Sequence, residues 1–170
     1  QTDRPGPDTD RTPSIAAFSL GPFQTNCYVV RNPGSAAAWI VDAGFDPSPL
    51  IEFVRSQSLR PQALILTHAH ADHIAGVDAV LNAFPNLPIH IHPAERAWLS
   101  DPHANLSAGM GLPVVCRSIT KTRVHDLQDA DTLTLDDQVW RIAHTPGHSP
   151  GSVSLINEEA RTAIVGDVLF

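Results

Sequence analysis

The chain has 170 residues, of which 42% are hydrophobic, and a formal net charge of −7 at pH 7. A chain of this length forms one domain and can bury a sizeable core. The acidic balance argues against a nucleic-acid partner, because nucleic-acid binding favours a basic surface. No apolar stretch approaches the roughly 20 residues that a membrane span requires, so no membrane partner is expected either.

Two local features bear on the compartment. Cys27 and Cys116 lie far apart and form neither a Cys-x-x-Cys motif nor a disulfide framework. We predict two buried thiols in the reducing cytoplasm, with a single disulfide as the alternative. No charged segment followed by an apolar segment opens the chain, so no secretory signal is visible. Because the first residue is Gln1 and not Met, a targeting segment can have preceded it.

The first elements follow a polar leader. Residues 1–13 hold three prolines, three aspartates and no apolar side chain, so we predict a disordered leader, with an interaction tail as the alternative. The domain then covers residues 14–170. Its first three strands are predicted at 15–20, 27–31 and 36–41 from their apolar content and the turn residues between them.

A single carboxylate and a helix come next. Asp42 directly follows the third predicted strand, where it either faces a metal site or caps the loop. A helix is then predicted, because Pro47 and Pro49 suit a first helical turn and apolar residues follow at helical spacing. The pair Arg60-Pro61 is expected to end this helix.

The segment 67–73 concentrates three imidazoles and one carboxylate. The apolar run 63–66 precedes it and suits a buried strand. A helix is predicted after it, from Ile74 to about Phe84. The ligand-type side chains therefore lie on a strand-to-helix turn, where α/β folds build their sites.

The spacing within this segment favours two metal ions over one. His68 and His70 point the same way if the turn is extended, because side chains alternate along an extended chain. Asp72 and His73 are adjacent and must diverge. Imidazole and carboxylate groups are ordinary ligands of zinc and similar divalent ions. We therefore expect one ion at the His-x-His pair and a second at the Asp-His pair; the alternative is four ordinary residues without metal.

A second His-x-His pair competes for the ligand role. Residues 89–92 alternate between apolar and polar, which predicts a strand, and this strand carries His90 and His92. No Asp-His pair or strand-to-helix turn follows them, so we expect exposed or hydrogen-bonded histidines. A short helix at 93–99 and an irregular segment at 100–113 come next.

The second half of the chain is rich in predicted strands. Residues 114–124 are expected to include a short strand. Segments 132–135 and 139–143 form a hairpin, and two further strands are predicted at 153–156 and 163–165. The pattern indicates a mixed α/β domain.

Two further ligand candidates lie at strand ends in this half. The turn 145–147 contains proline and glycine, which let the chain bend sharply so that His148 faces inward. His144 is the competing candidate. Asp167 follows the last predicted strand and closes the site.

The pattern His-x-His-x-Asp-His at 68–73 resembles the signature of the metallo-β-lactamase superfamily. Segments 21–30, 145–152 and 166–170 resemble that family's opening strands, its third ligand loop and its bridging-aspartate loop. Their order is most similar to the glyoxalase II-like branch, the hydroxyacylglutathione hydrolases and their small relatives. The resemblance implies an α/β (α+β) fold of the αββα type, a four-layer sandwich.

The resemblance also implies a set of metal ligands. Three histidines hold one ion, the Asp-His pair holds the other, and one aspartate bridges them: His68, His70 and His148; Asp72 and His73; and Asp167. Two divalent ions are implied, zinc first, with iron or manganese as alternatives. Asp42 would orient a ligand. The family supplies one more histidine after the bridging aspartate, and the chain stops three residues after Asp167, so we expect a domain that is incomplete at its C-terminus.

The implied reaction is hydrolysis of a small thioester or ester, such as an S-acylglutathione, by a metal-bound hydroxide. Asp72 or Asp167 would orient the nucleophile and move a proton. A lactone is an almost equal substrate candidate. Two other classes remain open: a persulfide dioxygenase with one iron held by His68, His148 and Asp167, and a truncated pseudoenzyme that binds metal without turnover.

Overall fold

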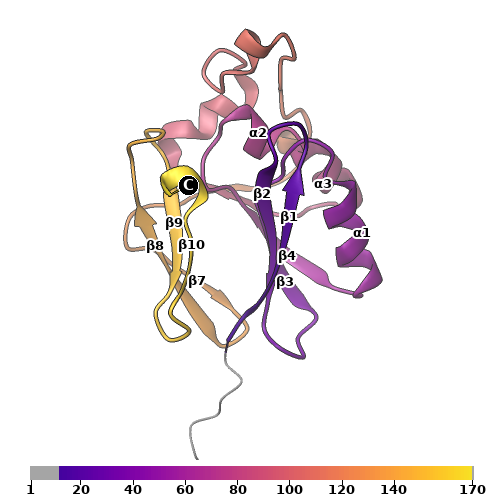
Figure 1. Cartoon of the computed structure of the whole chain (residues 1–170), viewed down its shortest axis with the longest axis vertical. Coiled ribbons are helices and arrows are strands. Elements are labelled where there is room, and N and C mark those ends of the chain that lie inside the picture. The colour runs from indigo at the N-terminus through magenta and orange to yellow at the C-terminus, as the bar shows by residue number, and fades with distance from the viewer. Residues whose placement is uncertain (1–11, 170) are drawn as a thin grey trace, which may run out of the picture.

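Two β-sheets form the centre of the protein in a computed structural model that describes residues 12–169 (Figure 1). The larger sheet has the strand order β1-β2-β3-β4-β5-β6 and the smaller one the order β10-β9-β8-β7. The strands of the larger sheet are β1 Ser14–Leu20, β2 Thr25–Arg31, β3 Ala37–Val41, β4 Arg60–Ile65, β5 Ile89–Ile91 and β6 Val124–Asp126. Those of the smaller sheet are β7 Thr132–Leu135, β8 Gln138–His144, β9 Val153–Asn157 and β10 Thr162–Ile164. Residues 1–11, which make up most of the predicted leader, lie outside the described residues.

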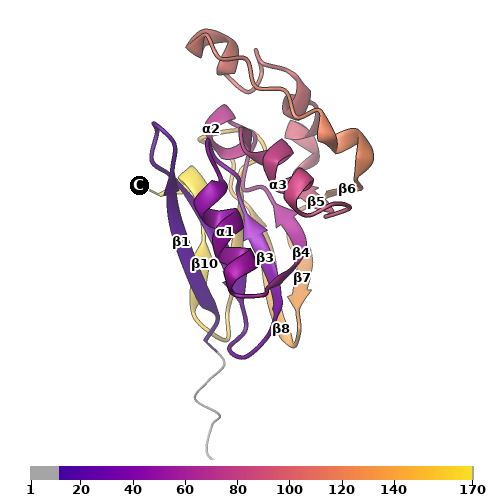
Figure 2. The ribbon, with the colours of Figure 1, turned by 90° about the vertical axis from the view of Figure 1, so that its right-hand side faces the viewer.

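The helices are short. The α-helices are α1 Ser48–Ser56, α2 Ala71–Ile74 and α3 Val77–Ala83, and the 3-10 segments are η1 Pro93–Ser100, η2 Ser107–Met110, η3 Ser118–Lys121 and η4 Gly166–Val168. Figure 2 shows α1 on the face of the larger sheet that points away from the smaller sheet. Within the described range, no helix is long and apolar enough to cross a membrane.

Two apolar layers hold these elements together. The first lies between the helices and the larger sheet, where Leu50 and Val54 of α1 pack with Ile40 and Leu64. The second lies between the sheets. The rings of Trp39 and Trp140 meet there edge to face, with centroids 6.1 Å apart, a favourable aromatic geometry.

The expected fold class is confirmed. Residues 12–169 build three layers of the sandwich, namely the helices, the larger sheet and the smaller sheet. Val139, which points outward from β8, is 55% exposed, so these residues leave that outer face open at this point. Cys27 and Cys116 are buried and not bridged, which agrees with the predicted thiols.

The larger sheet changes direction where the site forms. Strands β1 to β3 are antiparallel, whereas β3, β4 and β5 run parallel to one another. The carboxyl ends of these parallel strands therefore lie at one edge of the sheet. Leu64 and Ile65 of β4 face opposite apolar layers, as its continuous apolar run predicts.

The single helix predicted from Ile74 to about Phe84 is wrong, because α2 and α3 are separate. The break falls at Ala75 and Gly76. The Gly76 amide donates to the Ala43 carbonyl at 2.8 Å, and a Cβ on Gly76 would lie 2.3 Å from the Gly44 carbonyl oxygen. The loop after β3 therefore passes too close to the chain for a continuous helix.

The predicted helix end at Arg60-Pro61 is also wrong. Helix α1 stops at Ser56, and Ser58 takes a left-handed φ of 53°. Arg60 already begins β4. The pairing of β3 and β4 shifts register between Ala38 and Trp39, next to Pro61, which fits a residue without an N–H in a strand.

The strand expected within 114–124 is displaced towards its end. Only Val124 of that range belongs to a strand, β6. The Asp78 carboxylate accepts hydrogen bonds from the amides of Arg117 and Ser118 at 3.0 and 2.8 Å. These bonds hold the chain in the turn that becomes η3, so it reaches the sheet edge only afterwards.

Candidate metal centre

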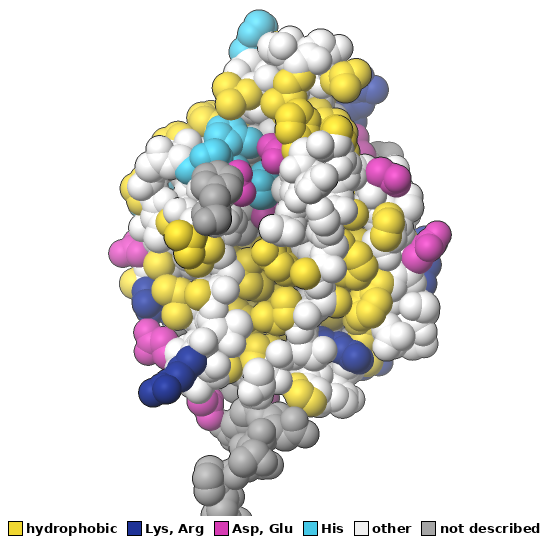
Figure 3. Space-filling view, viewed as in Figure 1, with side chains coloured by type: hydrophobic (Ala, Val, Ile, Leu, Met, Phe, Trp, Pro, Cys, Tyr) yellow, Lys and Arg dark blue, Asp and Glu magenta, His cyan; other side chains and the backbone are white. Residues whose placement is uncertain are grey.

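Histidine and aspartate side chains gather at the sheet edge where β3, β4 and β8 end. Figure 3 shows them as a cluster of imidazoles and carboxylates on the upper part of one face. His68 follows β4, His70 is the N-cap of α2 and His73 lies within α2. His148 lies in the loop between β8 and β9, and Asp167 lies in η4. The two sheets are joined at this edge by the Val153 amide, which donates to the Thr67 carbonyl at 2.8 Å.

The cluster contains two groups of converging ligand atoms, each within 4.8 Å of one another: His68, His70 and His148; and His68, His73 and Asp167. His68 belongs to both groups. The two oxygens of Asp167 point to different groups, because Oδ1 lies 3.1 Å from His73 Nε2 and Oδ2 lies 3.5 Å from His148 Nε2. Asp167 therefore faces both groups.

The residues fit divalent ions. Among the described residues, Nε2 of His68 is a buried nitrogen without a hydrogen-bond partner, and Nε2 of His73 is buried with the carboxylates of Asp167 and Asp72 at 3.1 and 3.5 Å. Such orphaned polar atoms are costly and rare in folded proteins. Cations would bind both nitrogens through their lone pairs, and imidazole with carboxylate is an ordinary donor set for zinc and iron.

Asp42 orients His73 and is not a simple loop cap. Its Oδ2 lies 2.8 Å from His73 Nδ1 and accepts from Thr67 Oγ1 at 2.7 Å, while its Oδ1 accepts from the Thr67 amide at 2.8 Å. A proton on His73 Nδ1 leaves Nε2 to act as ligand. Asp42 is fully buried and takes a left-handed φ of 61°, a strain of the kind found at functional sites.

His68 and His73 differ in protonation. Burial lowers the pKa of His68 to about 2, with the neighbouring His73 and His70 acting in the same direction, so His68 is neutral as a ligand must be. Burial also lowers the pKa of His73, but the charges of Asp42 and Asp167 outweigh it and raise the pKa to about 10. Metal binding at His73 must therefore displace a proton.

Asp72 lies beside the second group and not within it. Its Oδ2 is 3.5 Å from His73 Nε2 and accepts a hydrogen bond from Thr25 Oγ1 at 2.8 Å. The sequence predicted Asp72 as a ligand there, and that stays a prediction; the converging atoms of this group belong to His68, His73 and Asp167. Thr25 itself, 6% exposed, was not singled out from the sequence.

The competing histidines pair with one another. His90 stacks on His125 with ring centroids 5.0 Å apart, and His92 stacks on His144 at 4.1 Å. His144 Nε2 also lies 2.9 Å from the Pro150 carbonyl. None of these four belongs to the converging groups of the described residues. The chain therefore brings His148, and not His144, to His68.

The segment after β5 also reaches the cluster. The ring of Trp98 in η1 stacks on His70 at 6.0 Å, and the Ala71 amide donates to the Asn105 carbonyl at 3.0 Å. Glu95 of η1 contacts both ligand loops and was missed from the sequence. Its only local signal, an acid three residues after His92 at a helix start, is the spacing of a capping box, which points to a different role.

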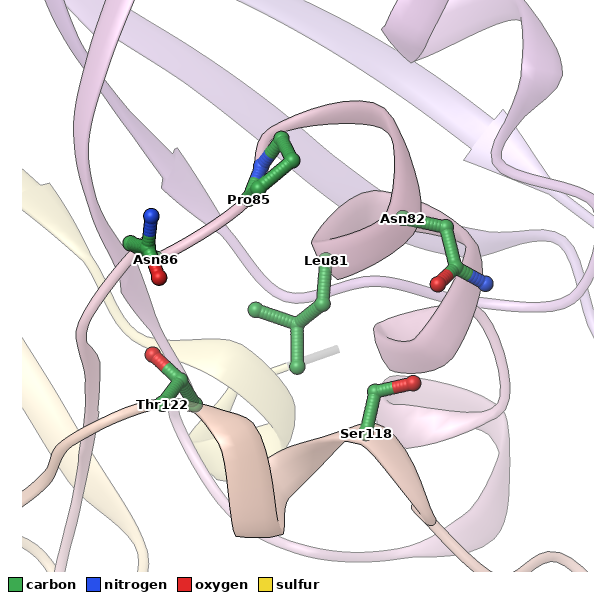
Figure 4. A pocket seen from close by; sticks show the side chains of 6 residues that line it. All are labelled: Leu81, Asn82, Pro85, Asn86, Ser118 and Thr122. Carbon is green, nitrogen blue, oxygen red and sulfur yellow. The ribbon is translucent and has the colours of Figure 1, made fainter.

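The pocket in Figure 4 is not the candidate site. It encloses about 260 Å³ between the end of α3 and η3 and is lined by Leu81, Asn82, Pro85, Asn86, Ser118 and Thr122. No member of the two converging groups lines it. This pocket is therefore separate from the histidine cluster.

Comparison with known proteins agrees with this geometry. The family model described as the metallo-beta-lactamase superfamily matches residues 20–170. The chain belongs to the metallo-beta-lactamase superfamily. Its fold and histidine-rich cluster are those of a metallo-hydrolase of this superfamily, which binds divalent metals.

Three members of the superfamily illustrate the range of its relatives. The crystal structure of the BLEG-1 B3 metallo-beta-lactamase is 41% identical with a TM-score of 0.84, and the similarity covers 92% of this chain and 73% of that one. TTHA1623, solved in a di-iron-bound form, is 30% identical with a TM-score of 0.74 over the same shares. The hydroxyacylglutathione hydrolase GloC of Haemophilus influenzae is 30% identical over 157 residues, 92% of this chain and 72% of that protein. The last similarity supports the glyoxalase II-like branch.

Proposed function

We propose that the chain hydrolyses small thioesters, with S-acylglutathiones as the substrate class, using two divalent ions. The observation that carries the proposal is the pair of ligand groups that share His68, with Asp167 facing both. His68, His70 and His148 would hold the first ion. His73 and Asp167 would hold the second ion, and Asp72, whose Oδ2 lies 3.5 Å from His73 Nε2, is close enough to join them.

The side chains divide the work of the reaction. Bound divalent ions supply a water of lowered pKa and polarisation of the substrate carbonyl. Asp72 is half-buried and its Oδ2 is fixed by Thr25, so its Oδ1 is the atom that orients the attacking water and accepts its proton. Asp167 holds the spacing of the two ligand groups through its two oxygens.

The leaving group favours a thioester. A thiol has a pKa of roughly 8.5, so a thiolate departs with little need of a proton, whereas an amine leaving group needs one. The similarity to GloC supports an S-acylglutathione, and the similarity to BLEG-1 makes a β-lactam the natural competing substrate. The similarity to TTHA1623, solved in a di-iron-bound form, supports two ions and makes iron a candidate beside zinc.

The test is a substrate panel with one readout. Initial rates would be measured for an S-acylglutathione, a thioester without glutathione, a lactone and a β-lactam, on protein whose metal content and intact mass are known. We expect the highest kcat/KM for a thioester. A higher kcat/KM for the β-lactam would contradict the proposal, as would oxygen consumption with a glutathione persulfide in place of thioester hydrolysis.

A further inference from the structure

Glu95 is a buried carboxylate outside every motif that carries the ligands. It lies in η1, is 0% exposed, and faces three hydrogen-bond donors. Oε2 accepts from the Ala69 amide at 2.6 Å, and Oε1 accepts from Ser149 Oγ at 2.5 Å and from the Gly151 amide at 2.6 Å. Three donors around two oxygens are the surroundings of an ionised carboxylate, which can only accept.

The partners of Glu95 belong to two separate ligand loops. Ala69 stands between His68 and His70, and Ser149 directly follows His148. His70 Nδ1 and His148 Nε2 lie 2.8 Å apart although 78 residues separate them in the chain. One side chain thus joins the backbones of both loops next to the atoms that must converge.

The chain makes room for this contact at Gly151. A Cβ on Gly151 would lie 2.9 Å from Glu95 Cγ and 3.0 Å from Cδ. Gly151 is not among the residues with positive φ, so a side chain is excluded there by space and not by backbone conformation. Ser152 extends the contact, because its Oγ lies 2.7 Å from Ser149 Oγ.

We propose that Glu95 is a positioning residue that sets the geometry of the first ion's ligands by clamping the His68-Ala69-His70 turn to the His148 loop. This role presupposes the metal-dependent hydrolysis proposed above and acts through the three histidines. It is distinct from the role of Asp42, because Glu95 contacts the backbone and one serine and, unlike Asp42, makes no hydrogen bond to a ligand imidazole.

The clamp predicts a selective loss of one ion. In Glu95→Gln the amide nitrogen cannot accept, so at least one of the three donors loses its partner. Loss of such a supporting contact typically weakens metal affinity by about 10- to 100-fold. We expect that loss for the first ion only, measured by zinc titration of metal-stripped protein against a chromophoric chelator.

Reference variants identify which ion is affected. His70→Ala should remove the first ion and His73→Ala the second, so the Glu95→Gln titration is compared with both. Cobalt(II) absorption spectra of the same proteins report ligand geometry directly, and we expect Glu95→Gln to change the bands that His70→Ala removes. Glu52→Gln, an exposed acid on α1, is the matched control and should titrate as wild type.

Smaller changes cover the case in which Glu95→Gln does not fold, which circular dichroism would reveal. Ser149→Ala removes one hydrogen-bond donor to Glu95, and Gly151→Ala introduces a methyl group that clashes with the Glu95 side chain. Each substitution should lower the affinity for the first ion several-fold. Wild-type affinity for both ions in these folded variants, or an equal loss of both ions, would overturn the proposal. Two ions bound without thioester turnover would refute the hydrolase function alone, whereas no metal binding by wild type would overturn both.

Discussion

The metal centre has two halves, the ligands of the first ion and those of the second. Each half is supported by one buried carboxylate, and the two carboxylates act in different ways. Asp42 follows a strand and contacts the ligand His73 directly, with 2.8 Å between Oδ2 and Nδ1. Glu95 lies in a 3-10 segment and contacts the loops around the ligands. Asp42 therefore governs the protonation of one imidazole, whereas Glu95 governs where three imidazoles lie.

Both carboxylates are fully buried, so each depends on its donors. An ionised carboxylate without partners is costly inside a protein, and removal of one partner of a buried charge is strongly destabilising. Asp42 has the Thr67 amide, the Thr67 hydroxyl and His73, while Glu95 has two amides and Ser149. The ligands of the first ion are therefore placed through backbone contacts of their loops, whereas His73 is placed by direct contact with a carboxylate.

The largest expected effect falls on His68, a direct ligand of the first ion. His68→Ala should abolish binding of the first ion and lower kcat/KM by more than about 100-fold, since direct ligands matter more than their supports. His90→Ala is the control, because His90 stacks on His125 away from the cluster. Metal content would be measured by elemental analysis. Equal metal loss in the two variants would break the ligand assignment.

The support that Asp42 gives to His73, a ligand of the second ion, is tested by Asp42→Asn. The amide keeps the volume but removes the charge that raises the pKa of His73. We expect the second ion to bind about 10- to 100-fold more weakly and the first to keep its affinity, in a zinc titration. Asp46→Asn, at an exposed position, is the matched control. A lower affinity for the first ion instead would contradict the assignment of Asp42 to the second ion.

A smaller effect is expected where a hydroxyl supports a catalytic candidate. Thr25→Val removes the donor to Asp72 Oδ2, and a hydrogen bond to a charged group contributes about 1.5–3 kcal/mol. We expect kcat/KM to fall about tenfold or somewhat more with both ions still bound. Thr132→Val on the exposed side of β7 should leave the rate unchanged. An unchanged rate in Thr25→Val would remove Asp72 from its proposed role.

The smallest expected effect is on stability and concerns His90, which lies outside the metal centre. Burial, with the neighbouring His125, lowers the pKa of His90 from 6.5 to about 4. The unfolded chain binds a proton at this residue as the pH falls through 6.5, and the folded chain binds it only near 4, so the free energy of unfolding falls between these values. Urea unfolding of metal-free protein at pH 7 and pH 4.5 should show a smaller loss for His90→Gln than for wild type. His103→Gln, at an exposed position, should behave as wild type; equal losses in all three proteins would contradict the assignment.

The ligand turn was predictable from sequence, and Asp42 was singled out as a candidate, because their signals are local. A strand end, the His-x-His-x-Asp-His spacing and the Pro-Gly turn before His148 all lie within a few residues of the groups they place. Glu95 was not predictable, because its partners are 26, 54 and 56 residues away and two of them are backbone amides. The break at Gly76 has the same origin, since its cause is the approach of the Gly44 carbonyl from another loop.

The most direct test of the central claim is thioester hydrolysis by one sample before chelation, after chelation and after return of metal. We expect a rate that is lost on chelation and restored by about two equivalents of zinc or iron, with no restoration in His68→Ala. A thioesterase rate that survives complete removal of metal would contradict it.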